Sequence, residues 1–162
     1  MDIKIKAVQA VIPADANIIV GQSHFIKTVE DLQEIIVSAV PGIQYGLAFN
    51  EASGPCLVRT AGNDNALIEA AKENARATGA GHTFYLLIKK AFPINILKQI
   101  QGCGEVVNIY AATANPLQII LTESEQGAGI MGVIDSFSPK GVESDADKKD
   151  RKDMLRLFGY KF

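Results

Sequence analysis

The chain has 162 residues, of which 48% are hydrophobic and 21% charged, and its formal net charge is −2. That length fits one domain with a full core, so we expect a single domain over residues 1–162. A dedicated nucleic-acid-binding protein would usually be basic, and this chain is not. We expect no signal peptide and no membrane partner, because the first residues alternate like a strand and no apolar run is long enough to span a bilayer.

The two cysteines, Cys56 and Cys103, indicate a reducing compartment. They are far apart in the sequence, do not form a Cys-x-x-Cys pair and are too few to crosslink a small secreted domain. We therefore expect two free thiols in a cytoplasmic protein.

The first third of the chain predicts a strand, a helix and a hairpin. Alternating side chains over residues 3–8 predict a strand near a sheet edge. Helical spacing predicts a helix over residues 28–39, and a Pro-Gly pair ends it. Side chains alternate again over residues 43–50 and 56–61, which predicts two strands. The Ser-Gly-Pro turn between these strands predicts a hairpin.

The rest of the chain predicts three helices and four strands. Asn63-Asp64-Asn65 opens the first helix and Gly79 ends it. The terminal helix over residues 145–158 has many basic side chains, and we expect its anchor to be Met154, Leu155 and Phe158. The segments between them are a strand at 82–89, a short helix from Pro93 to Gly102, and strands at 106–113, 117–122 and 130–135.

Strands and helices are interleaved along the chain, yet several strand pairs are joined by tight turns. This pattern favours an α/β or α+β fold in one domain, with helices packed on a mixed β-sheet. The sequence contains neither the glycine-rich fingerprint of a dinucleotide site nor a P-loop, and no cluster with the spacing of metal ligands.

The most informative segment is Gly79-Ala80-Gly81-His82-Thr83-Phe84. Backbone N–H groups beside two glycines can approach an anion closely, because no Cβ intervenes. An imidazole beside such a loop can accept and pass on a phosphoryl group, which makes His82 the candidate catalytic residue. The competing interpretation is structural: a glycine turn followed by a half-buried strand histidine. Considered without the rest of the chain, residues 79–84 favour this structural interpretation.

Other polar residues and glycines lie at the ends of predicted elements, where sites are usually built. Many of them also have a structural interpretation: Asp64 as a helix N-cap, Asn115 as part of a turn, and Arg59 as an ion-paired strand residue. The candidate binding residues are Asn50, Glu51, Arg59, Asn63, Asp64, Gly79, Gly81, Asn115, Gly127, Gly129 and Asp135.

Short motifs follow one another in a characteristic order along nearly the whole chain. They are Glu51-Ala52-Ser53-Gly54, Gly62-Asn63-Asp64, Gly79-Ala80-Gly81-His82, Ala91-Phe92-Pro93-Ile94-Asn95, Ala112-Thr113-Ala114-Asn115-Pro116, Gly141-Val142-Glu143, and Leu155-Arg156 to Gly159-Tyr160-Lys161. This ordered set resembles the adenosine-specific kinase family of archaea and bacteria. The resemblance implies a protein that binds adenosine or AMP and has a histidine that can be phosphorylated, here His82.

One position departs from the family pattern. Relatives often have an arginine between two glycines where this chain has Ala128. If that arginine helps to hold phosphate, this chain must use another cation, such as Arg59 or Lys89, or must hold phosphate less well.

By resemblance, the expected reaction passes a phosphoryl group through a phosphohistidine to the ribose hydroxyl of adenosine. Residue types suggest Asn50, Asn63 and Asn115 for adenine recognition. Carboxylates that could accept the hydroxyl proton, or hold Mg²⁺ with a nucleotide donor, are Glu51, Asp64 and Asp135. The phosphoryl donor is open. Two alternatives remain: a non-catalytic module that binds or senses adenosine or AMP, which the lack of an ATP loop favours, and a structural protein whose His82 is only a strand residue.

The apolar content of the chain predicts self-association. It is high for the chain length, and several strands are apolar on both faces. We therefore expect a homo-oligomer, and the family resemblance suggests a trimer.

Overall fold

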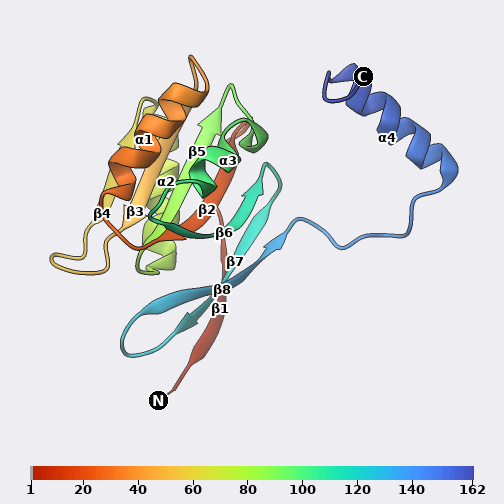
Figure 1. Ribbon diagram of the computed structural model, residues 1–162. Helices are drawn as coiled ribbons and strands as arrows, with labels where there is room; N and C mark the ends of the chain where they lie inside the picture. The colour runs from red at the N-terminus through yellow and green to blue at the C-terminus, as the bar shows by residue number, and fades with distance from the viewer. Residues whose placement is uncertain (1) are drawn as a thin grey trace.

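The computed structural model describes residues 2–162 as two β-sheets with helices α1, α2 and α3 packed on the larger sheet and helix α4 apart from it (Figure 1). Of the two classes that the sequence left open, α/β and α+β, the structure has the α+β fold. Within residues 2–162, no helix is long and apolar enough to cross a membrane. The elements in chain order are β1 (Lys4–Gln9), β2 (Asn17–Ser23), α1 (Thr28–Ala39), β3 (Gln44–Asn50), β4 (Val58–Gly62), α2 (Asn65–Thr78), β5 (Thr83–Lys89), α3 (Pro93–Gln101), β6 (Val106–Thr113), β7 (Leu117–Glu123), β8 (Ala128–Asp135) and α4 (Asp145–Leu157).

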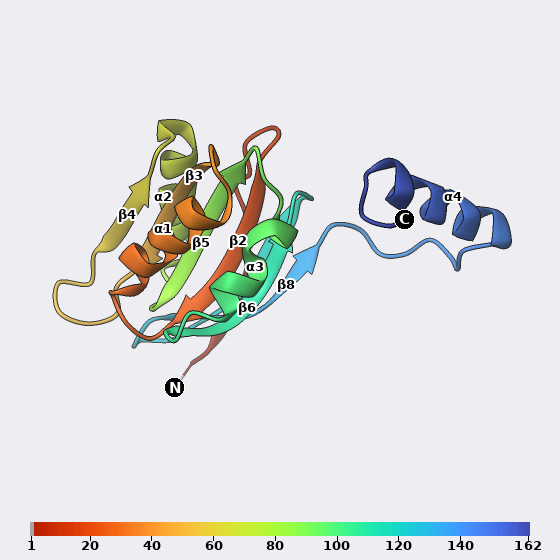
Figure 2. The same ribbon diagram turned by 45° about the horizontal axis from the view of Figure 1, so that its top comes forward.

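The larger sheet has the strand order β4-β3-β5-β2-β6, and each neighbouring pair is antiparallel. Helices α1 and α3 cover one face of this sheet and α2 covers the other (Figure 2). Successive strand side chains alternate between the two faces, so Leu47 and Phe49 of β3 join the core under α1 and α3, whereas Ala48 joins the core under α2. Burial on both faces explains why the central strands are apolar throughout.

Helix α2 lies very close to β3 because Gly46 has no side chain. A Cβ at Gly46 would lie 2.1 Å from the backbone carbonyl carbon of Leu67 in α2. Because protein interiors are close-packed, a side chain at this position would push the helix off the sheet. The buried stripe of α2 is correspondingly made of small residues, namely Ala70, Ala71 and Ala75.

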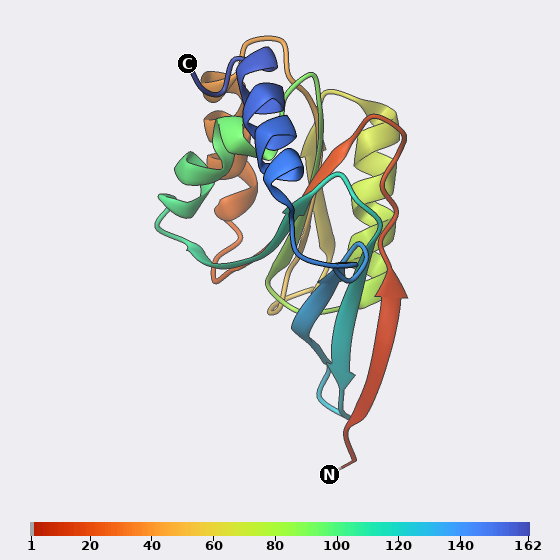
Figure 3. The same cartoon turned by 90° about the vertical axis from the view of Figure 1, so that its right-hand side faces the viewer.

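The smaller sheet has the order β1-β7-β8 and is antiparallel. Its residues Leu117, Ile119 and Leu121 pack into the same core as α2, and the outer part of the sheet projects beyond the larger sheet (Figure 3). Where the sequence predicted a mixed sheet, every pair of strands is antiparallel. One isolated parallel bridge, between Ala80 and Ala128, joins the turn before β5 to the start of β8.

Several local predictions are confirmed. β1 is an edge strand, β3 and β4 form a hairpin, and α2 ends at Gly79, which adopts the left-handed conformation with φ 57°. These features depend on the alternation of side chains and on glycine at a helix end, which are local properties of the sequence.

Because of the strand register, polar residues lie together at each of the two ends of the larger sheet. Ser23, Asn50 and Thr83 lie at one end, which we call the His82 end. Asn17, Lys89 and Asn63 lie at the opposite end, which we call the Asn63 end. The length of β5 separates the two by about 20 Å, given the rise of a strand per residue.

Residues 136–162, which we call the arm, leave the body after β8 and include α4 (Figure 1). No residue of α4 is buried. The prediction that Met154, Leu155 and Phe158 anchor this helix is therefore wrong within a single chain. An amphipathic pattern shows that one face of a helix needs a partner, but it does not say which surface provides it.

Candidate functional site

The Gly79–His82 turn connects α2 to β5 at the His82 end. The backbone N–H of His82 donates to Asn50 O at 2.7 Å, and its carbonyl oxygen accepts from the backbone N–H of Ser23 at 2.9 Å. His82 has a φ of 60°, so it belongs to the turn and not to the strand in which the sequence placed it. A left-handed non-glycine residue is uncommon, and such residues gather at functional sites.

Asn50 fastens the turn to α2. Its Nδ2 atom donates to Ala75 O at 2.9 Å and to Ala80 O at 3.1 Å. The residue is buried, so these bonds satisfy a polar group that would otherwise be costly to bury. Asn50, predicted as a binding residue, therefore has at least a structural role in holding the turn.

The imidazole of His82 lies on the α1/α3 side of the turn. It stacks on Phe49 with ring centroids 6.0 Å apart and an angle of 20° between the ring planes. Phe49 belongs to the core under α1 and α3, and His82 is half-buried beside it. The ring is therefore held in position but is still open to solvent on part of its surface.

Arg59 lies next to Phe49 on the same face of the sheet, because the two residues are paired across β3 and β4. Its Nη2 atom donates to both carboxylate oxygens of Glu51, at 3.1 and 3.0 Å. A hydrogen bond from the backbone N–H of Leu57, together with Arg59, lowers the pKa of Glu51. Glu51 is thus an ionised partner that holds the guanidinium on the side of the sheet where Phe49 lies.

Two buried polar atoms at this end have no hydrogen-bond partner within residues 2–162: Arg59 Nε and Ser23 Oγ. Alternation along β2 places Ser23 on the same face as Ile19 and Phe49. Its backbone is also hydrogen-bonded to His82. Unpaired buried donors are rare, and a pair of them near one imidazole suggests a place for an oxyanion. The sequence did not single out Ser23, since a serine at a strand end has no distinctive pattern.

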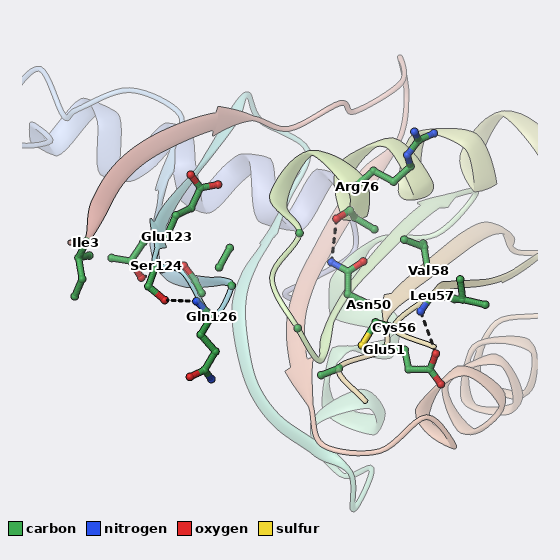
Figure 4. A pocket seen from close by; sticks show the side chains of 18 residues that line it. Ile3, Asn50, Glu51, Cys56, Leu57, Val58, Arg76, Glu123, Ser124 and Gln126 are labelled. Carbon is green, nitrogen blue, oxygen red and sulfur yellow. Dashed lines mark hydrogen bonds between the residues drawn. The ribbon is translucent and has the colours of Figure 1, made fainter. Parts of the chain in front are cut away.

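A cavity of about 840 Å³ opens on the other side of the Gly79–His82 turn (Figure 4). One wall comes from residues 50–58 and the end of α2, including Arg76, and the other from Ile3 and the hairpin between β7 and β8. Of the predicted binding residues, those that line it are Asn50, Glu51, Gly79, Gly81, Gly127 and Gly129. His82 and Arg59 are not among its lining residues. Arg76 and Gln126 are lining residues that the sequence did not single out.

Four predicted site residues lie far from this region. Asn63 accepts from the backbone N–H of Tyr45 at 2.9 Å and donates to Ile43 O at 2.9 Å. Asp64 caps α2 by accepting from the backbone N–H of Leu67 at 3.1 Å.

Asp135 and Asn115 are bound to the same threonine at the Asn63 end. Asp135 accepts from Thr113 Oγ1 at 2.9 Å, and the backbone N–H of Asn115 donates to that oxygen at 3.0 Å. The prediction that Asn63, Asp64, Asn115 and Asp135 gather near His82 is wrong within one chain. Their polar groups satisfy local backbone or neighbouring side chains at the opposite end of the sheet.

A charged cluster near His82 has the donor types of a metal site. Asp31, Cys103 and Glu105 each offer one ligand atom, and these atoms lie within 4.8 Å of one another. Lys27 forms ion pairs with both carboxylates, and the one with Glu105 measures 3.1 Å. Hydrogen bonds with Asp31 and then with the Cys103 thiol lower the pKa of Glu105 to about 2. The lysine thus supplies the positive charge that the cluster needs.

The whole chain is similar to known proteins in sequence and in structure. A family profile described as adenosine specific kinase matches residues 8–161. The crystal structure of PH1918 protein from Pyrococcus horikoshii OT3 is similar to this chain, with 41% sequence identity and a TM-score of 0.96 over 99% of both chains. Among proteins with curated descriptions, none matches significantly.

Proposed function

We propose, from the premise that this chain belongs to the adenosine-specific kinase family, that it binds adenosine or AMP and carries a phosphoryl group on His82. The observation that carries the proposal is the pairing of a half-exposed imidazole with a neighbouring guanidinium that has a free donor. His82 stacks on Phe49, and Arg59, paired with Phe49 across the sheet, has a buried Nε without a partner within residues 2–162.

The chemistry requires a nucleophile and charge neutralisation. A neutral imidazole nitrogen attacks the phosphorus of the donor, the bond from phosphorus to the leaving oxygen breaks, and a phosphohistidine forms. In the second step the ribose hydroxyl attacks the same phosphorus, the imidazole leaves, and the hydroxyl proton passes to Glu51, the one predicted carboxylate that lines the cavity, which gives AMP. Arg59 Nε and Ser23 Oγ, which have no partner within residues 2–162, are the proposed donors to the phosphoryl oxygens, and Glu51 holds Arg59 in place.

The cavity is the proposed nucleoside site. Its volume of about 840 Å³ lies within the range of small-molecule sites, and its walls combine backbone around Gly79 and Gly81 with the polar side chains of Arg76 and Gln126. Glu51 joins the two parts of the site, because it lines the cavity and binds Arg59. Of the three asparagines predicted for adenine recognition, only Asn50 lies at this cavity.

A second function, a module that binds or senses adenosine or AMP without turnover, has one observation in its favour. His82 does not line the cavity, and its ring lies on the α1/α3 side of the turn. A nucleoside in the cavity would then meet the glycine turn and not the imidazole. The two functions share the binding site and differ in whether the phosphoryl group reaches His82.

The experiment is intact-protein mass spectrometry of the purified chain, and of the chain incubated with ATP and adenosine. We expect the added mass of one phosphoryl group in the parent, and its loss in His82→Gln, because an amide nitrogen is not a usable nucleophile. His82→Asn serves as a second variant, since asparagine tolerates the left-handed backbone better. Adenosine binding by calorimetry should survive in both variants.

His24→Gln is the matched control, because His24 is the other histidine and is exposed. It should leave the phosphorylation unchanged. Phosphate that maps to His24, or transfer that persists in folded His82→Gln, would overturn the assignment. Adenosine bound with no phosphorylated residue under any condition would support the binding module.

A further inference from the structure

The Gly79–His82 turn is held by buried hydroxyl groups on the side away from the imidazole. Thr83 and Tyr85 of β5 are both buried. They lie on the α2 side of the larger sheet, because side chains alternate along the strand and Phe84 between them packs under α1 and α3. The ring of His82 lies on the α1/α3 side. These hydroxyl groups can therefore act on the imidazole only through the backbone of the turn.

The hydroxyl groups form a chain that ends on the carbonyl oxygen of Ala80, within the turn. Thr83 Oγ1 lies 2.6 Å from Ala80 O, and because a carbonyl oxygen can only accept, the Thr83 hydroxyl donates. The single hydroxyl hydrogen of Thr83 is then used, so the hydroxyl of Tyr85, 3.1 Å away, donates to Thr83. Thr78 Oγ1, 2.5 Å from the Tyr85 hydroxyl, links this chain to the end of α2.

Ala80 O is the point at which several parts of the fold meet. Besides the Thr83 hydroxyl, it accepts from Asn50 Nδ2 at 3.1 Å and from the backbone N–H of Thr83 at 3.4 Å. Asn50 also donates to Ala75 O, a bond drawn in Figure 4. The carbonyl of the turn is thus tied to the end of α2, to β3 and to β5, and a buried acceptor with this many donors has little freedom to move.

His82 needs such a hold, because its φ is 60°. The left-handed conformation is unfavourable for a residue with a Cβ and persists only where the surrounding structure enforces it. On one side of the residue, its N–H donates to Asn50 O and its carbonyl accepts from the N–H of Ser23. On the other side, the hydroxyl chain fixes Ala80. Together these bonds determine the direction in which the imidazole leaves the backbone toward Phe49.

We propose that Thr83 and Tyr85 are positioning residues for His82: their hydroxyl groups hold the Ala80 carbonyl and so keep His82 in the conformation that places its imidazole on Phe49. The effect on phosphoryl transfer rests on the proposed function, because it is there that a nucleophile must be held in line with the phosphorus. The hold on the imidazole can be measured without any reaction.

The first measurement is the NMR spectrum of the imidazole ring protons in the parent and in full-length Thr83→Val, Thr83→Ser and Tyr85→Phe. The chain has two histidines, so His24→Gln assigns the ring signals, and the signals of exposed His24 are an internal reference. We expect the His82 signals to shift in Thr83→Val and Tyr85→Phe, because a displaced ring meets a different ring current from Phe49. They should keep the parent positions in Thr83→Ser, which retains the hydroxyl.

The second measurement is the rate of phosphohistidine formation on folded protein over a range of ATP concentrations. In Thr83→Val the maximal rate should fall about tenfold while the ATP concentration at half-maximal rate stays the same, because a misplaced nucleophile slows the chemical step and not binding. Thr83→Ser should keep the parent rate. Tyr85→Phe should show a smaller fall, since Thr83 can still donate to Ala80 O. It also provides the test if Thr83→Val does not fold.

The matched control is Thr113→Val, the same substitution at a buried threonine of the Asn63 end, whose hydroxyl donates to Asp135. It should lower stability and leave both the His82 signals and the rate unchanged. An equal fall of the rate in Thr113→Val would show a general effect of stability and would overturn the inference.

Two further results separate this inference from the proposed function. If the parent is phosphorylated, and folded Thr83→Val keeps either the His82 signals or the rate of the parent, the positioning role is wrong and the proposed function stands. If the parent forms no phosphohistidine, the proposed function and the role in transfer are both wrong, whereas the NMR comparison still decides whether the hydroxyl groups hold the ring.

Discussion

The two ends of the larger sheet contain similar residues and differ in how those residues are used. At the Asn63 end, Asn63 bonds to the backbone on both sides of its amide, and Thr113 and Asp135 bond to each other. At the His82 end, buried Arg59 Nε and Ser23 Oγ have no partner within residues 2–162. At the first end the polar groups are satisfied within the chain, whereas the second end has buried donors for which the described residues supply no partner.

The difference shows how polar residues at element ends can be sorted. A polar group that satisfies a neighbouring backbone group contributes to stability, and its removal leaves a buried partner unpaired. A buried polar group left unpaired lowers stability, so its presence at the same end of the sheet as a half-buried imidazole favours a ligand there. Substitutions at the two ends should therefore have different effects, one on phosphate chemistry and the other on folding.

Among the substitutions that compare the two ends, Arg59→Gln should give the largest effect. We expect phosphorylation of His82 to fall about a hundredfold, the usual loss when one donor to a developing or bound oxyanion is removed. The measurement is the rate of phosphohistidine formation on folded protein. Lys89→Gln is the control, because Lys89 is the other cation proposed from the sequence and lies at the Asn63 end. Loss of phosphorylation in Lys89→Gln, and not in Arg59→Gln, would reverse the assignment of the two ends.

Asn63→Ala should affect stability and leave phosphorylation per folded molecule unchanged. The substitution leaves the N–H of buried Tyr45 without its side-chain acceptor, so we expect a loss of about 2 kcal/mol in the free energy of unfolding. Urea denaturation measures this loss. Asn65→Ala, at the exposed start of α2, should change stability by less than about 0.5 kcal/mol. Reduced adenosine binding in folded Asn63→Ala would contradict a purely structural role.

Glu105→Gln should show that the His82 end depends on pH. The pKa of Glu105 is lowered from its ordinary value of 4.5 to about 2. Because the folded pKa lies below the unfolded one, the stabilisation is fully present above pH 4.5 and is lost as the pH falls toward 2. We expect the variant to be about 1.5 kcal/mol less stable than the parent at pH 7, and this difference to disappear by about pH 2.

The control for this pH dependence is Glu30→Gln, at an exposed position of α1. Its stability should follow that of the parent at every pH. The cost of Asn63→Ala should likewise be constant over the acid range, because a neutral amide carries no proton that titrates there. A Glu105→Gln difference that stayed the same from pH 7 to pH 2 would show that Glu105 does not form the ion pairs described.

Local predictions from the sequence were accurate where the signal itself is local. The hairpin of β3 and β4, the end of α2 at Gly79 and the cap by Asp64 all depend on alternation or on the preference of single residues. The interpretation of Asp64 and Asn115 as structural residues was also available from the sequence, beside the functional one. Their distance from His82 was not, because the antiparallel register decides which element ends meet.

Taken alone, the sequence determined the main helices and strands, one domain of α/β or α+β class and the family to which the chain belongs. Only the tertiary structure decided which face of the turn carries the imidazole, that Arg59 lies beside Phe49, on which this ring stacks, and that α4 leaves the body. The physical reason is the range of each interaction. Hydrophobic period, caps and glycine conformations act within a few residues. Cross-strand pairing and the partner of an amphipathic face depend on contacts between segments that are distant along the chain, or between different chains.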